Sequence, residues 1–445
     1  MEMMGSKTQL ESSALEQNTA LTASASWLPA LDGFRGLAVL SVIIVHYSSS
    51  SFTNMPIAWL GVCGFYALSA FLIAYLTRRE QIRTGTYSIK NFFIRRILRI
   101  WPLYFFLIIT LVYVMGEWSP VPSIADKNVN YQFLREQLWN LPTFMTSWGY
   151  AFNQIHGSLY PSGFNFWMPD FLGVFWSISV EEQFYIIFPL FFFLFLRWPL
   201  KTVATTMIIG FTLRVLWLFL PSSIVGSGGG MYYAPFSYID TFALGTAAGY
   251  LAADREALLQ SRVVRGLKFP GAEFVLGAFL LITAYYWSNV CWNPYGWYAP
   301  FIYTILAIIF PLLLLRIIAY PSCLGARILQ LNLLRNIGFL SFGMYMWHLF
   351  VFRVYFINCD AMIKGYSFTS QFANENFVWI RFIYILAIIM AVSCLSYLII
   401  ERPFLAMKAK LTKNRNDVST IKYFRLLVGC LMVVLFFNCF IWSFG

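Results

Sequence analysis

Charged residues are scarce in this sequence. Only 11% of its 445 positions are Asp, Glu, Lys or Arg, whereas 59% are hydrophobic and the mean hydropathy is +0.67. An ordinary soluble domain carries about 25% charged residues, and a soluble chain this apolar would expose large hydrophobic patches. The composition therefore excludes an ordinary soluble globular protein.

Three further features are missing. The seven cysteines show no metal-ligand spacing, so no metal site is expected. Residues 1–30 are polar and lack the basic and apolar segments of a cleaved signal peptide, so we expect a disordered cytoplasmic tail. No internal repeat is evident, which argues against a transporter built from duplicated halves.

Cys291 and Cys359 fall in predicted outer loops. An oxidising compartment permits a disulfide between them, and two free thiols are the alternative.

Long apolar runs are what the sequence has instead. A transmembrane helix needs about 20 mostly apolar residues, and such runs recur along the whole chain. We therefore predict an all-α polytopic integral membrane protein with about eleven transmembrane helices, a ten-helix core plus one C-terminal helix. The predicted spans are 34–52, 57–77, 98–115, 171–196, 202–220, 236–253, 272–289, 299–318, 337–357, 377–400 and 424–443. A half-embedded segment is the alternative for the first.

The net charge of +12 reflects basic residues in the loops on one side of the membrane and not a surface that binds nucleic acid. Lys and Arg concentrate in alternate loops, at 78–99, 197–201, 255–268, 316–335 and 402–425. The opposite loops hold only Lys127, Arg135 and Lys364, with Arg353 near the outer end of the ninth predicted span. This asymmetry is the positive-inside pattern. It predicts a multi-pass protein of the inner (plasma) membrane, with its N-terminus in the cytoplasm, its C-terminus outside and no nucleic-acid partner.

Ionisable residues within the predicted spans are candidates for function, because they are costly there. Arg35 and His46 lie eleven residues apart in the first span, which puts both on one helix face about 16 Å apart. His46 is suited to be a general base, or it bonds a neighbouring helix. His348 is expected at similar depth in the ninth span.

The fourth span carries the adjacent carboxylates Glu181 and Glu182. Ser177, Glu181 and Tyr185 follow the i, i+4, i+8 spacing of one helix face. An ion pair with a buried Arg is the structural alternative.

A basic cluster precedes the third span. Arg95 and Arg99 are expected to share a face, with Arg96 turned away. Such a cluster suits a phosphorylated ligand, since Arg pairs bidentately with phosphate. The alternative is that these arginines only mark the cytoplasmic side of the membrane or contact anionic lipid headgroups. The long outer loop, 116–170, is rich in Trp and Tyr and is interpreted as an interfacial belt or as a lid or platform for a sugar-containing acceptor.

Taken together, these motifs resemble the membrane acyltransferase-3 family, which includes bacterial O-acetyltransferases of lipopolysaccharide, exopolysaccharide and peptidoglycan. The opening block L-D-G-F-R-G at 31–36 contains Arg35, and His46 follows Arg35 after ten intervening residues. The other matching blocks are 61–73, R-R-x-x-R-I-x-P-x-Y at 95–104, W-S-I-S-V-E-E-Q-F-Y at 176–185, S-F-G-M-Y-M-W-H at 341–348 and 396–404.

The resemblance implies transfer of an acyl group, usually acetyl from acetyl-CoA, across the membrane to a hydroxyl of an extracytoplasmic glycan or lipid-linked sugar. Acyl-CoA is then a donor substrate, with no permanently bound cofactor. His46 is the implied base or acyl acceptor, with Glu181 orienting its imidazole. Implied donor or substrate contacts are Arg35, Arg95, Arg99, Ser179, Tyr185 and His348. A transporter or flippase for an acyl or glycan-lipid substrate is the rival.

The chain departs from the family pattern at Gly64, Ala70 and Tyr238, where an acidic residue, a glycine and an arginine are common. Its expected organisation is a transmembrane acyltransferase domain at 31–407, a basic cytoplasmic linker at 408–423 and an extra helix at 424–445. In some family members such a helix leads to a periplasmic esterase-like domain, and here that partner is expected to be a separate protein.

Overall fold

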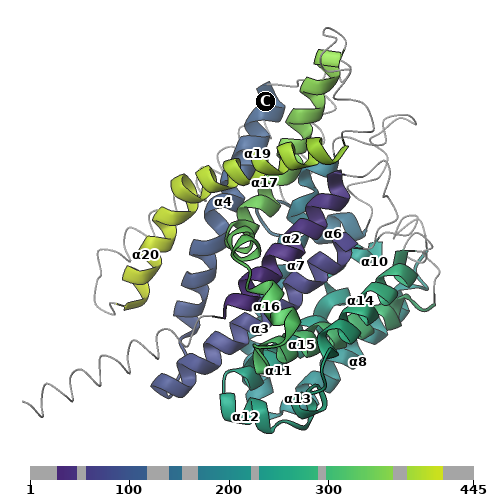
Figure 1. Ribbon diagram of the computed structural model, residues 1–445, viewed down its shortest axis with the longest axis vertical. Helices are drawn as coiled ribbons and strands as arrows, with labels where there is room; N and C mark the ends of the chain where they lie inside the picture. Colours follow the sequence, from purple (N-terminus) through teal and green to yellow (C-terminus); the bar gives the residue numbers. More distant parts are fainter. Residues whose placement is uncertain are drawn as a thin grey trace, which may run out of the picture.

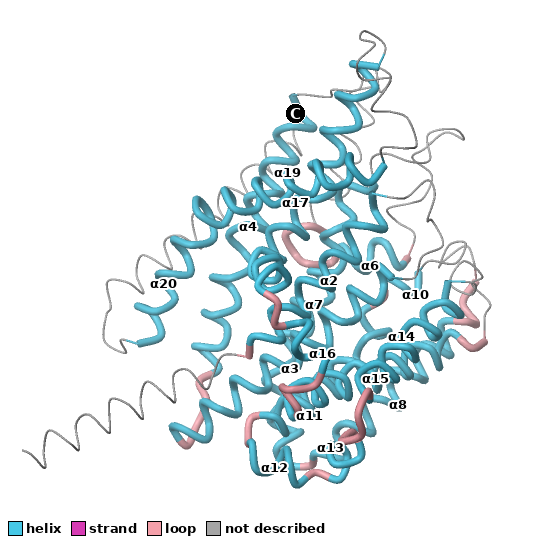
Figure 2. The backbone as a smooth tube through the Cα atoms, viewed as in Figure 1, coloured by secondary structure: helices cyan, strands magenta, loops and turns pink. Residues whose placement is uncertain are grey.

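The computed structural model describes residues 28–47, 57–117, 140–152, 169–221, 230–288, 297–363 and 378–413. Within these ranges the regular structure is helical throughout, without a strand (Figure 2), which agrees with the predicted all-α class. The long helices are α2 (Pro29–Tyr47), α3 (Ile57–Thr84), α4 (Ile89–Glu117), α7 (Pro169–Arg197), α8 (Pro199–Trp217), α11 (Ile239–Ala252), α14 (Ala272–Ser288), α15 (Ala299–Ala319), α17 (Asn332–Ile363), α19 (Val378–Ser396) and α20 (Arg402–Lys413). The shorter elements are α6 (Thr146–Ala151), α10 (Gly230–Tyr233), η1 (Pro235–Tyr238), α12 (Arg255–Gln260), α13 (Arg262–Gly266), α16 (Leu324–Leu329) and the π-turn η3 (Tyr397–Glu401).

Six helical segments in the described part of the chain are long and apolar enough to cross a bilayer. They lie in α2, α3, α7, α8, α15 and the continuous stretch from α19 into α20. The protein is therefore a multi-pass helical membrane protein, and the count of eleven spans stays a prediction. The predicted span 424–443 lies outside the described residues. α20 extends to Lys413, into the segment predicted as a linker.

Helix α3 packs against α2, α7, α11, α14 and α15. In its most apolar stretch 72% of the residues are buried, compared with 17% in α8. Close approach depends on small side chains: a Cβ added to Gly249 of α11 would lie 2.1 Å from the Phe71 carbonyl oxygen of α3. Small residues at such contacts are typical of membrane bundles, and α3 is held firmly in place.

The outer helices present apolar side chains outward. Leu200 and Ile208 of α8, Phe279 of α14 and Ile383 of α19 are each more than half exposed. In water such a surface would aggregate, whereas lipid tails are a suitable neighbour for it. These outer faces are the lipid-facing side of the bundle.

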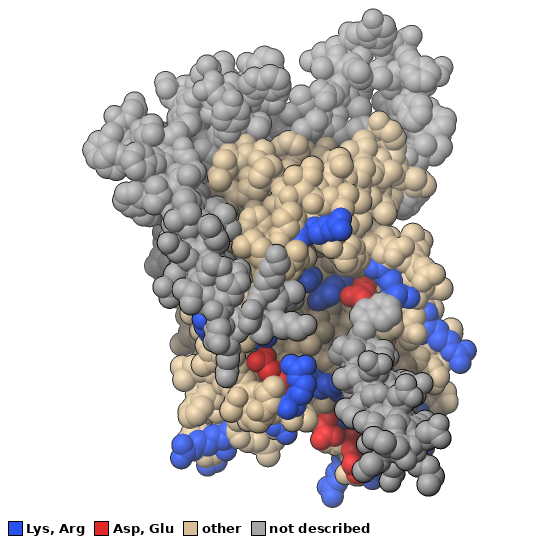
Figure 3. Space-filling view, turned by 90° about the vertical axis from the view of Figure 1, so that its left-hand side faces the viewer, with Lys and Arg blue, Asp and Glu red and all other residues tan. Residues whose placement is uncertain are grey.

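Charge gathers toward one end of the molecule. The α3–α4 connection and the pair α12–α13, which belong to predicted basic loops, lie at the same end of the bundle (Figure 1). Figure 3 shows the Lys and Arg side chains of one face in its lower part, with an almost uncharged described surface above them. This distribution agrees with the charge asymmetry read from the sequence.

A buried ion pair ties α8 to α11. Both terminal nitrogens of the Arg214 guanidinium donate to Asp240, at 3.0 and 2.8 Å, and neither side chain is exposed. Thr304 of α15 also donates to the Asp240 carboxylate, at 3.1 Å. Tyr238, which stands where an arginine is common in the family, packs its ring on Tyr66 at 4.7 Å. The arginine that faces Asp240 therefore comes from α8.

Candidate functional site

A cavity of about 740 Å³ opens between α2, α3, α4, α7 and α17. Three guanidinium groups line it, from Arg35, Arg96 and Arg99. Glu181 is the only carboxylate among the described residues of its lining. Because positive charge predominates in a partly enclosed space, the cavity favours an anionic ligand. We call it the arginine cavity.

The arrangement of the basic cluster differs from the sequence prediction. Arg96 lines the arginine cavity with Arg99, and its guanidinium lies 5.6 Å from the centre of the Tyr185 ring. Arg95 instead donates to Glu80 of α3, at 2.8 Å. The expectation that Arg96 turns away is therefore wrong, and Arg95 is neutralised by a carboxylate.

Glu181 is held by two hydroxyl groups inside this cavity. Ser69 of α3 and Tyr185 of the same helix both donate to its Oε1 atom. Ser177, Glu181 and Tyr185 all line the cavity, which confirms that they share one helix face. Neither Glu181 nor Glu182 takes part in an ion pair within the described ranges. Glu182 turns to another face, where Trp101 donates to it at 3.2 Å.

A second cavity, of about 680 Å³, contains both membrane histidines. His46 of α2 is exposed into it, while His348 of α17 is fully buried in its wall. The Nε2 atom of His348 lies 3.3 Å from Nδ1 of His46. We call it the histidine cavity. His348 was expected at a similar depth, and the structure brings the two rings together.

Backbone carbonyls determine which nitrogen of each ring carries a proton. Nδ1 of His348 lies 2.6 Å from the Tyr345 carbonyl oxygen, and Nδ1 of His46 lies 2.9 Å from that of Val42. A carbonyl only accepts hydrogen bonds, so both Nδ1 atoms are donors. In the neutral rings each Nε2 then keeps its lone pair. His348 accepts the shared Nδ1–H of His46, and Nε2 of His46 is the basic atom.

Aromatic side chains form a large part of the lining of the histidine cavity. Tyr150 comes from α6, Trp176 from α7, and Tyr232 and Tyr233 from α10. Their rings pack on one another, with Tyr150 stacked on Tyr233 at 4.9 Å and Trp176 against Tyr232 at 4.7 Å. Rings that combine an apolar face with a polar edge suit a ligand that is itself amphipathic.

Ser179 holds part of the long loop inside the bundle. Its hydroxyl donates to the Phe144 carbonyl oxygen and accepts from the Ser147 backbone N–H, at 3.4 Å. Gln183 donates to the same carbonyl, at 2.7 Å. Phe144 has a φ of 56°, which a bulky residue adopts only when its surroundings enforce it. Ser179 lines neither cavity; it positions the segment that brings Tyr150 to the histidine cavity.

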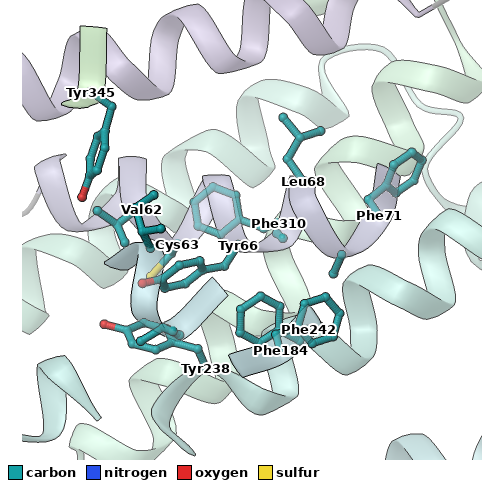
Figure 4. Close-up of a cluster of buried hydrophobic side chains, with 14 of the residues drawn as sticks. Val62, Cys63, Tyr66, Leu68, Phe71, Phe184, Tyr238, Phe242, Phe310 and Tyr345 are labelled. Atoms are coloured by element: carbon teal, nitrogen blue, oxygen red, sulfur yellow. The ribbon is translucent and has the colours of Figure 1, made fainter. Parts of the chain in front are cut away.

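The two cavities meet at a common wall. Of the described residues, Val62 and Tyr345 line both. Figure 4 shows the Tyr345 ring standing beside Val62, and the Tyr345 hydroxyl is hydrogen-bonded to that of Ser177. His46 and Glu181 thus lie in adjoining cavities, each with other partners. The group against the His46 imidazole is His348, where the sequence had suggested Glu181.

Several lining residues were missed by sequence reasoning. Arg96 had a usable signal, since its i, i+3 spacing to Arg99 also places two side chains on one face. Ser69 and Tyr345 lie within the quoted motif blocks, but neither is ionised near neutral pH and neither was singled out. Tyr150 was noted only as one of the aromatics of the long loop, because no periodicity there identifies buried positions.

The state of Cys291 and Cys359 and the disordered N-terminal tail stay predictions. Cys291 lies outside the described residues, as do the side chain of Cys359 and residues 1–27. No group of three or more His, Cys, Asp or Glu side chains that could hold a metal occurs in the described part of the chain. Glu401 is buried at the end of η3, within the continuous helical stretch from α19 into α20.

Sequence comparison places these features in a known group of proteins. Peptidoglycan O-acetyltransferase OatA of Listeria monocytogenes is 26% identical over 337 residues, covering 73% of this chain and 49% of the relative. O-acetyltransferase OatA of Staphylococcus aureus is 26% identical over 332 residues, with 73% and 50% covered. The chain thus spans about half the length of these curated relatives. No solved structure matches. Residues 28–400 match the family described as an acyltransferase domain, so the chain belongs to the acyltransferase-3 family.

Proposed function

We propose that this protein transfers an acyl group, acetyl from cytoplasmic acetyl-CoA, to a hydroxyl of an extracytoplasmic glycan or glycolipid. The observation that carries the proposal is the common wall between the arginine and histidine cavities. A phosphorylated donor and a histidine base would meet there. The names of the relatives, one of which acts on peptidoglycan, support a glycan acceptor.

The donor would be held by its phosphates in the arginine cavity. Arg35, Arg96 and Arg99 offer planar guanidinium groups, which bind phosphate oxygens by pairs of charge-assisted hydrogen bonds. Because the basic loops lie at the same end of the bundle, we assign this end to the cytoplasm and the membrane to the inner (plasma) membrane. The N-terminus would then be cytoplasmic.

His46 would perform the chemistry with its Nε2 atom. In the direct route, this atom removes the proton of the acceptor hydroxyl while the hydroxyl oxygen forms a bond to the thioester carbonyl carbon. The carbon–sulfur bond breaks, and the departing CoA thiolate takes the proton back from the imidazolium. Alternatively, Nε2 attacks the thioester carbonyl carbon and the carbon–sulfur bond breaks, which releases the CoA thiolate. The acceptor hydroxyl then attacks the acyl carbon, the bond from that carbon to Nε2 breaks, and the hydroxyl proton passes to the thiolate. His348 orients the ring in both routes, as the third group does in other acyl-transfer sites.

Inside-out membrane vesicles provide the test, because they expose the cytoplasmic face to added donor. Vesicles that contain the protein are given acetyl-CoA with a ¹³C-labelled acetyl group, and the acetate released from their glycans by mild alkali is measured by mass spectrometry. The wild type should introduce labelled ester. His46→Ala should lower its rate by about 10²- to 10⁴-fold while the protein still inserts in the membrane. Equal labelling by both would overturn the proposal, and donor loss without ester would favour transport.

A further inference from the structure

Val62 and Tyr345 stand at the only place where the two cavities share described residues. Val62 belongs to α3 and is 5% exposed, whereas Tyr345 belongs to α17 and is 8% exposed. They come from helices far apart in the sequence, and neither carries a charge. Their role is therefore not explained by phosphate binding or by proton transfer.

Acyl transfer constrains what must lie between the cavities. The carbonyl carbon of the donor has to come within about 3–3.5 Å of the attacking oxygen. The donor phosphates are assigned to the arginine cavity, and the attacking hydroxyl must lie within reach of His46 in the histidine cavity. On the proposed function, the reacting carbon therefore lies at the common wall, and the hydrocarbon tail of the acyl group touches it.

The wall is rigid on both sides. Next to Val62, a Cβ added to Gly61 would lie 2.6 Å from the Ala38 carbonyl oxygen, so α2 and α3 are in close contact at this level. A β-branched side chain such as valine also has little rotamer freedom in a helix. On the other side, the Tyr345 hydroxyl is bonded to Ser177 and its ring packs edge-on against Phe65, at 6.2 Å. A longer acyl chain would find no space that opens easily.

We propose that Val62 and Tyr345 form the acyl-binding subsite, and that the Val62 side chain limits the acyl group to a short one. This inference rests on the proposed function and adds to it the residue that selects the donor. Shortening Val62 to alanine removes two methyl carbons, and butyryl differs from acetyl by two methylene groups. The two carbons removed from the cavity wall therefore correspond to the two carbons added to the acyl group.

The experiment is a competition within one reaction. Inside-out vesicles receive equal concentrations of acetyl-CoA and butyryl-CoA, and mild alkali releases acetate and butyrate esters for quantification over a His46→Ala background. The ratio of the two products reports relative kcat/KM and is independent of how much protein is folded. Val62→Ala should raise the butyrate-to-acetate ratio by about 10-fold or more, since a methylene in an apolar pocket changes specificity by ~10- to 200-fold. In a second competition between equal concentrations of acetyl-CoA and propionyl-CoA, Val62→Ile should lower the propionate-to-acetate ratio.

Val39→Ala is the matched control, because Val39 is a fully buried valine of α2 that lines neither cavity. Its product ratio should stay within about twofold of the wild type. An unchanged ratio in Val62→Ala, or an equal shift in Val39→Ala, would overturn the assignment of the subsite while acyl transfer itself stands. Failure of the wild type to form any ester above the His46→Ala background would overturn the proposed function and this inference together.

Discussion

Nε2 of His348 lies 3.3 Å from Nδ1 of His46, inside one cavity. Because Nδ1 of His348 donates to a backbone carbonyl, its Nε2 atom faces His46 as an acceptor. This fixes the tautomer of His46 that leaves Nε2 available as a base. The pair joins α2 to α17, helices that also pack closely along their length.

Replacing His348 should slow transfer without weakening donor binding. His348→Leu removes one of the two acceptors of the His46 N–H and leaves only the Val42 carbonyl, and we expect turnover to fall by about 10- to 100-fold. The KM for acetyl-CoA should stay within about twofold, because the arginine cavity is untouched. His348→Gln keeps a carbonyl acceptor and should retain more activity than His348→Leu. Steady-state rates in vesicles measure both quantities, and equal loss in the two variants would contradict the positioning role.

The three arginines of the basic motif, Arg95, Arg96 and Arg99, should differ in how much they contribute to donor binding. Arg96→Ala and Arg99→Ala should each raise the KM for acetyl-CoA by ~10- to 100-fold, since a hydrogen bond to a charged group contributes about 1.5–3 kcal/mol. Arg95→Ala should change it by less than about threefold, because Arg95 is paired with Glu80 away from the cavity lining. A KM in Arg95→Ala as high as in Arg96→Ala would show that the cavity is not where the donor phosphates bind.

The sequence was informative wherever a property belongs to one helix. Apolar runs and basic loops predicted a helical membrane protein, and the i, i+4, i+8 spacing correctly grouped Ser177, Glu181 and Tyr185. What a single helix does not specify is its rotation against its neighbours. At 100° per residue, Arg99 lies about 40° from Arg95 and about 60° from Arg96 around the axis, so spacing allowed either partner. The burial of Ile94 and Leu98 against Leu411 settles the rotation of α4.

The same limit applies to His46. Depth in the membrane placed Glu181 and His348 at similar levels, and Glu181 was the expected partner of its imidazole. The choice depends on which helix packs beside α2 near its end, and that contact joins residues 302 positions apart. Helical periodicity carries no information about such a pairing. The folded segment 140–152 was missed for a related reason, since its buried hydroxyls and aromatics follow no regular spacing.

Ser179→Ala should loosen the loop segment that reaches the histidine cavity. The hydroxyl bonds the Phe144 carbonyl and the Ser147 backbone, and its loss leaves buried polar groups without that partner. We expect a destabilisation of about 1–3 kcal/mol, seen as a lower melting temperature of the detergent-purified protein. Tyr150 is then less well placed, so the rate should fall while the KM for acetyl-CoA is preserved. A rise in that KM with unchanged melting would instead place Ser179 in donor binding.

The packing of α11 on α3 gives the most direct test of the bundle. A methyl group on Gly249 would lie 2.1 Å from the Phe71 carbonyl oxygen, a backbone atom that has no way to rotate aside. Gly249→Ala must therefore push the two helices apart, and we expect a loss of about 1–3 kcal/mol or more. Gly277 of α14 is the matched control, because nothing lies within 4 Å of a Cβ added there. Gly277→Ala should be neutral or stabilising by about 0.5–1 kcal/mol, as alanine is the better helix former. Thermal unfolding of the two variants, followed by size-exclusion chromatography after heating, compares them directly; equal melting temperatures would mean that α3 and α11 are not in the close contact described above.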